Sequence, residues 1–113
     1  MRRPEFGDVI ASADFLFVTP DGDRREVTLR VAKPYEVSSI EWACPSEIQG
    51  HEPRYSDAHG GSSLQALCLA IALVRSRVEN FISKGGRVFG REDDLEWDPR
   101  HVMAVFGVPP YAA

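Results

Sequence analysis

Four residues of types that carry chemistry gather around the start of one expected helix. Cys44 could act as a nucleophile if a base or a helix N-terminus lowered its pKa, and His59 is the base nearest that helix. With Trp42 and Asp57, these residues form a candidate ligand site between a sheet and the helix N-terminus, where free N–H groups attract anions. The alternative is that Cys44 and Cys68 are small buried hydrophobic residues. We favour it because free cysteine is among the most buried residue types.

Other patterns of catalytic or metal-binding residues have little support. His51, His59 and His101 are scattered, and the chain has no H-x-x-x-H or C-x-x-C, so we expect no metal site. Neither a phosphate-binding glycine motif nor a G-x-S-x-G elbow is present. The acidic segment 92–98 lacks the spacing of a calcium loop and is interpreted as solvated surface. We expect no cofactor, and the sequence favours a protein that is not an enzyme.

The expected helix is marked at both ends. Ser62 and Gln65 fit the capping box S-x-x-Q, and Lys84-Gly85-Gly86 supplies a C-terminal cation and a glycine stop. Helical spacing predicts one full-length core face. It consists of Leu64, Leu67, Cys68, Ile71, Val74, Val78, Phe81 and Ile82.

A second apolar patch lies on the opposite side of the first half of this helix. It comprises Ala66, Leu69, Ala72 and Leu73, which a single helix on a sheet would leave facing water. Full burial of two leucines is worth about 1.5 to 3 kcal/mol each, so we expect the patch to be covered. Either residues 101–111 fold over it or a second copy does. We favour a symmetric homodimer.

The first half of the chain has the patterns of strands. Residues 15–18 form an apolar run and residues 26–31 alternate, with Pro20 and Gly22 in the turn between them, which predicts a β-hairpin. A third strand is expected at 40–44, with an interruption at Pro45 and a resumption at 47–48. A fourth is expected near 54–56. Four sequential strands before a helix favour an antiparallel meander.

Two further elements follow the long helix. Residues 87–89 have the pattern of a short strand, and Asp98-Pro99 begins a short helix. The expected fold is therefore α+β: an antiparallel sheet of about four strands, one long helix across one face, and a short C-terminal element. We expect a single domain over residues 1–113, with a flexible N-terminus (1–9) and a C-terminal extension (98–113).

Composition narrows the classes of partner. The chain has 113 residues, 43% of them hydrophobic, and a formal charge of −4, which disfavours binding to a nucleic-acid backbone. The longest apolar run, residues 66–74, is too short to cross a membrane, and no signal-peptide pattern follows Arg2-Arg3. We expect a cytoplasmic protein with both cysteines reduced.

Three short motifs resemble a family of small bacterial proteins described as a domain of unknown function. They are W-A-C-P at 42–45, E-I-Q-G at 47–50 and S-L-Q-A-L at 63–67. The resemblance spans roughly residues 10–97 and implies an N-terminal hairpin, a W-x-C-P strand and a helix followed by an acidic segment. It implies no catalytic residues.

Two functions are compatible with these patterns. The favoured one is a small non-catalytic interaction or accessory module that binds itself or another protein. The alternative is a small-ligand-binding protein or enzyme, with a site between the sheet and the N-terminus of the long helix. A well-formed pocket with a perturbed histidine or cysteine would favour the alternative.

Overall fold

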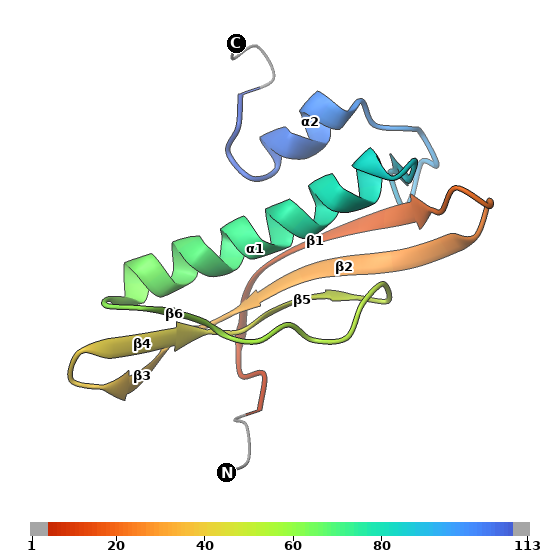
Figure 1. Cartoon of the computed structure of the whole chain (residues 1–113). Coiled ribbons are helices and arrows are strands. Elements are labelled where there is room, and N and C mark those ends of the chain that lie inside the picture. The colour runs from red at the N-terminus through yellow and green to blue at the C-terminus, as the bar shows by residue number, and fades with distance from the viewer. Residues whose placement is uncertain (1–4, 110–113) are drawn as a thin grey trace.

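The computed structural model describes residues 5–109, which form two antiparallel sheets with one long helix lying along both (Figure 1). This confirms the expected α+β class. The larger sheet has the strand order β5-β2-β1-β7 and the smaller one the order β3-β4-β6. The elements are β1 (Val9–Val18), β2 (Arg24–Ala32), β3 (Tyr35–Ser38), β4 (Glu41–Cys44), β5 (Ser46–Gln49), β6 (Ala58–Gly60), α1 (Ser63–Ser83), β7 (Arg87–Phe89) and α2 (Pro99–Ala104).

The hairpin of β1 and β2 is the longest pairing in the molecule. Phe15 lies opposite Val27, and the turn closes with Thr19 N–H donating to Asp23 O at 2.9 Å. Gly22 has a φ of 92°, which a glycine adopts without strain. The expected hairpin is confirmed. However, β1 begins six residues earlier than the apolar run predicted, because β2 is long enough to pair with all of it.

The chain changes sheets at two prolines. It leaves the large sheet at Lys33-Pro34, runs through β3 and β4 in the small sheet, and returns to pair β5 with β2 after Pro45. Proline has no N–H for a sheet ladder, so it ends one pairing and permits another. The strands therefore do not form the single expected meander. The fourth strand expected near 54–56 lies at β6 instead, in the small sheet.

The main core lies between the large sheet and the second half of α1. Phe17 and Phe81 stack at its centre with ring centroids 4.4 Å apart. Val102 of α2 is also fully buried there, so the C-terminal helix belongs to this core. The buried members are Phe15, Phe17, Val27, Leu29, Ile48, Val74, Val78, Phe81, Val88 and Val102.

The first half of α1 packs on the small sheet through its smallest side chains. Ala66 and Ala70 are fully buried with Cys44, whereas Leu64 is 68% exposed and Cys68 is exposed. The expected core face is therefore wrong in this half of the helix. The reason is the short distance between the helix and β6: a Cβ added to Gly60 would lie 2.8 Å from the backbone N of Ala66. Only small residues fit against such a close approach.

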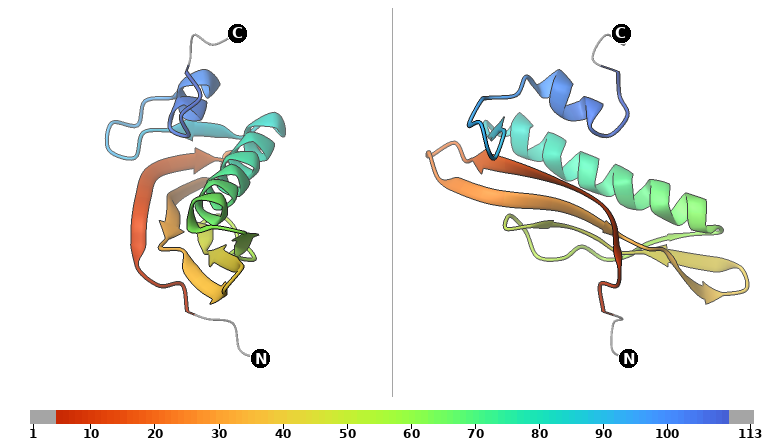
Figure 2. Two further views of the ribbon diagram at one scale, coloured as in Figure 1. Left: turned by 90° about the vertical axis from the view of Figure 1, so that its left-hand side faces the viewer. Right: turned by 180° about the vertical axis from the view of Figure 1, so that it is seen from behind.

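Segments at both ends of the described chain contact the body of the fold. Arg30 and Arg54 lie over the ring of Phe6, and Lys33 N–H donates to Asp8 O at 2.8 Å. At the other end, α2 lies beside the second half of α1 (Figure 2). Residues 1–4 of the expected flexible N-terminus and 110–113 of the expected extension lie outside the described residues.

Candidate functional site

The small sheet separates the residues of the predicted ligand site. In the β4–β6 ladder, Trp42 lies opposite Gly60 and Ala43 lies opposite His59. Opposed residues in an antiparallel pair project to the same face, and neighbours along a strand project to opposite faces. Trp42 and Cys44 therefore face α1, where both pack beside Ala66 and Ala70, while His59 projects away from the helix.

His59 contacts a carboxylate on that opposite face. Its Nδ1 lies 2.5 Å from Glu41 Oε2, and both side chains are about half exposed. A general base must be within hydrogen-bond reach of the proton that it takes. His59 does not meet this condition for the Cys44 thiol, because the strands lie between them.

The surroundings of Cys44 keep its thiol protonated. The side chain is fully buried and donates to Ala32 O at 3.3 Å. Burial, with a smaller contribution from the negative charge of Asp57, raises the pKa of Cys44 to about 11. A reactive cysteine needs a lowered pKa, so this thiol is structural. Cys68, which we expected to be buried beside it, is exposed on α1.

Asp57 is buried and engaged with two neighbours. Its side chain is 5% exposed, and it accepts hydrogen bonds from Tyr35 Oη at 2.6 Å and Arg54 Nη2 at 2.9 Å. These contacts tie the 51–57 loop to β3. The carboxylate therefore has a structural role that explains its position.

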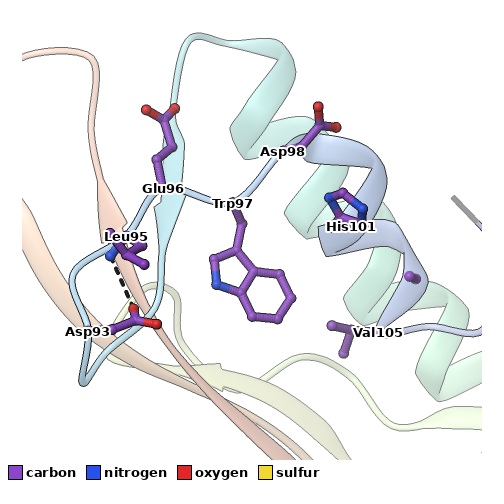
Figure 3. Close-up of a pocket in the computed structure, with 8 residues that line it drawn as sticks. Asp93, Leu95, Glu96, Trp97, Asp98, His101 and Val105 are labelled. Atoms are coloured by element: carbon purple, nitrogen blue, oxygen red, sulfur yellow. Dashed lines mark hydrogen bonds between the residues drawn. The ribbon is translucent and has the colours of Figure 1, made fainter.

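An open depression of about 630 Å³ lies beside the acidic segment, between Asp93 and α2 (Figure 3). Its floor is Trp97, whose ring makes an edge contact with Phe15 at 5.2 Å. The carboxylates at its rim are already bonded: Glu96 to Arg87 at 2.5 and 3.1 Å, and Asp98 to the backbone N–H of Arg100 at 2.8 Å.

These partners also set the charge state of the rim. Arg87 holds the pKa of Glu96 below its usual range, and the backbone N–H of Arg100 does the same for the pKa of Asp98. Over residues 5–109, no group of three or more His, Cys, Asp or Glu side chains could hold a metal ion. The acidic segment is thus a set of surface ion pairs and a helix cap, as its interpretation as solvated surface anticipated.

The predicted self-association patch is divided by the packing of α1. Ala66 is fully buried, Leu73 is half-buried, and only Leu69 (44% exposed) and Ala72 face solvent. The α2 segment does not cover them, because Val105 lies beside Ile71 on the other flank of α1. Intramolecular cover of the patch by residues 101–109 is therefore not found.

The first half of β1 has an unpaired outer edge. On that side β7 pairs only with Leu16, Phe17 and Val18, whereas β2 pairs with β1 at every residue from Val9 to Val18 except Ile10. Within the described chain, β1 from Val9 to Phe15 thus has a strand on one side only. Figure 2 (left) shows this part of β1 at the margin of the fold. Unpaired N–H and C=O groups along a strand edge are a template for another strand.

An apolar groove runs beside the same edge. It has a volume of about 150 Å³ and lies between β1, α1 and the end of α2. Small residues line it on the β1 side, and larger residues of β2, α1 and the segment after α2 line the rest. The groove is lined by Ala11, Ser12, Ala13, Leu29, Val31, Ile71, Val74, Val105 and Phe106.

Sequence reasoning missed this edge because Ala11, Ser12 and Ala13 have weak strand propensity. A signal was nevertheless present. The alternating pattern of the second strand continues to Val31, which is longer than residues 15–18 can pair. A hairpin with the turn at 19–23 requires its first strand to reach back to Ala11, the residue that lies opposite Val31.

Together these features define a small α+β domain in which one helix spans two antiparallel sheets. The chain belongs to the family described as a domain of unknown function (DUF6968), whose model matches residues 14–104. We expected the resemblance to end near residue 97. The match extends beyond it and includes α2. No curated protein and no solved structure is detectably similar to this chain. None of the helices within residues 5–109 is both long and apolar enough to cross a bilayer.

Proposed function

We propose that this protein is a non-catalytic interaction module whose binding surface is the outer edge of β1 from Ala11 to Phe15. The edge takes up an extended strand, from a second copy or from another protein. The observation that carries the proposal is the coincidence of unpaired backbone with an apolar groove at Ala11 and Ala13. Strand addition uses both features, since the backbone supplies affinity and the groove accepts alternate side chains.

The state of the candidate ligand-site residues supports a non-catalytic role. Cys44 is buried with a raised pKa, and His59 lies on the other face of the small sheet. Asp57 is occupied by Tyr35 and Arg54. A cytoplasmic location, in which both thiols remain reduced, is part of this proposal.

Peptide binding followed by amide chemical shifts tests the proposal. The probe is a soluble peptide of alternating valine and threonine with lysines at both ends, added to dilute ¹⁵N-labelled protein. We expect amide shifts at Ala11 to Phe15 and at the groove residues Ile71 and Val105. A Leu69→Glu variant should respond equally. Shifts confined to Leu69 and Ala72 would instead assign binding to the outer face of α1, and no shift at the β1 edge would refute the proposal.

A small cationic ligand is a second candidate. An open cavity of about 650 Å³ is bordered by three aromatic residues, Phe6, Tyr35 and Trp42. Three acidic residues, Glu5, Asp8 and Glu36, and one cation, Lys33, also line it. Aromatic faces and carboxylates together attract quaternary ammonium groups. Calorimetric titration with choline tests this function. Binding that is lost in Trp42→Ala would support it, and no heat of binding would exclude this ligand class.

A further inference from the structure

We infer that the strand taken up by the β1 edge is β1 of a second copy, paired antiparallel about a two-fold axis at Ala13. This inference rests on the proposed function and names its partner. The free edge of β1 has a defined limit at each end. At one end Leu16 is already paired with Phe89 of β7. At the other end the register between Val9 and Ala11 shifts, which marks a β-bulge at Ile10.

These two limits leave five regular residues, Ala11 to Phe15, whose middle residue is Ala13. In a symmetric antiparallel pair about Ala13, Ile10 of one copy would lie opposite Leu16 of the other. The outer side of Leu16 is already paired with β7, so the second strand has to leave the edge at Ile10. The bulge turns each strand away at this residue. The bulge and the end of β7 at Phe89 thus limit the two strands at matching points, which is a condition that a symmetric pair must satisfy.

The side chains of this register are complementary. Ser12 lies opposite Asp14 of the other copy, so a hydroxyl donor faces a carboxylate. Asp14 Oδ1 accepts from Thr28 at 2.8 Å and lies 3.4 Å from Arg91, which offsets the negative charge near the axis. On the inner face, Ala13 meets Ala13 and Ala11 meets Phe15. A pairing shifted by four residues, with its axis at Ala11, would place Asp8 directly opposite Asp14, where like charges repel.

The inner face of the pair would also cover apolar surface. The groove at Ala11 and Ala13 lies against the incoming strand, and Val105 at its rim is 41% exposed. Small residues on the β1 side leave room for the side chains of the second strand. A second copy therefore covers both the backbone edge and the groove of each partner.

Disulfide trapping tests the register directly. All variants carry Cys68→Ser to remove the exposed native thiol, and oxidised glutathione accepts the two electrons released as two thiols join. We expect Ala13→Cys to form a covalent dimer about tenfold faster than Ser12→Cys, because opposed residues lie within the Cα separation of about 4.4–6.8 Å that a disulfide spans. Ser12→Cys mixed with Asp14→Cys should also cross-link faster than either variant alone. The unfolding midpoint of each variant confirms that it is folded.

Two results would overturn this inference. Ser12→Cys cross-linking as fast as Ala13→Cys would show a different register, and a monomer by sedimentation with no cross-link would exclude self-pairing. The valine–threonine peptide separates that failure from failure of the proposed function. If the peptide shifts the β1 edge while the protein stays monomeric, the module binds a strand of another protein. If neither binds, the interaction function itself is wrong.

Discussion

Leu16 is the first residue of β1 that has a strand on its outer side, where it pairs with Phe89 of β7. Phe15, one residue earlier, has only β2 beside it among the described strands. This boundary is the main structural basis for the proposed function. The proposal adds no chemistry beyond backbone hydrogen bonding and apolar burial.

Removing the cap of α1 should weaken the fold without affecting the β1 edge. Gln65 N–H donates to Ser62 Oγ at 3.1 Å, and the Gln65 side chain accepts from Gly61 N–H at 2.7 Å. We expect Ser62→Ala to lower the free energy of unfolding by about 1 kcal/mol. Ser63→Ala, one residue into the helix, is the control. Equal denaturation midpoints for the two variants would contradict this assignment of the cap.

A methyl group at Gly60 should be poorly tolerated. Its Cβ would lie 2.8 Å from Ala66 N and 2.9 Å from the Gln65 side chain. We expect Gly60→Ala to destabilise the protein by about 1–3 kcal/mol, the usual cost of overpacking. Gly61→Ala is the matched control, because its Cβ would meet Gln65 Oε1 at an ordinary 3.6 Å. A Gly60→Ala variant as stable as the Gly61→Ala variant would show that α1 is not held close to β6.

The two native thiols should react at very different rates. Cys68 is exposed on α1, whereas Cys44 is buried with a pKa raised to about 11. A thiol reagent added to the native protein at mildly alkaline pH should modify one cysteine quickly and the second only after denaturation. Mass spectrometry of the labelled peptides identifies the site. Rapid labelling of Cys44 would restore the interpretation of this residue as reactive.

Acid should destabilise the fold through His51. Its ring lies edge-on to Phe17 and Phe81, and burial lowers its pKa from 6.5, with Arg25 and Arg77 acting in the same direction against Glu52. Between the folded and unfolded pKa values the unfolded state binds more protons, so stability rises with pH.

The contribution of His51 to the free energy of unfolding should therefore be fully present above the pKa that this residue has in the unfolded chain. It should decline as the pH falls below that value. Denaturant unfolding at a series of pH values from neutral to mildly acidic measures this slope. His51→Phe keeps an aromatic ring and should remove most of it. An identical slope in wild type and variant would assign the acid sensitivity to other groups.

The elements that depend on local sequence were predictable. The hairpin turn at Gly22, the cap at Ser62 and the helix start at Asp98 each follow from a few neighbouring residues, and each is found in the structure. The pairing of the later strands was not predictable in this way. It depends on the sheet change at Pro45, for which the sequence allowed either an edge strand or a bulge.

The faces of α1 and the candidate site required tertiary information. Hydrophobicity placed Leu64 and Cys68 in the core, but the proximity of β6 selects Ala66 and Ala70. Similarly, His59 is close to Cys44 in the expected order of elements. Its register opposite Ala43 places it on the other face of the sheet, and a single sequence does not reveal that register.

Amide hydrogen exchange along β1 is the most direct test of the proposed edge. The measurement compares dilute and concentrated protein, with and without the valine–threonine peptide, for the amides of Ala11 to Phe15 that point away from β2. We predict that these amides exchange quickly in dilute protein and become protected on concentration or with peptide, while amides on the outer face of α1, including Leu69, do not change. Exchange at the β1 edge that is independent of both additions would contradict the account.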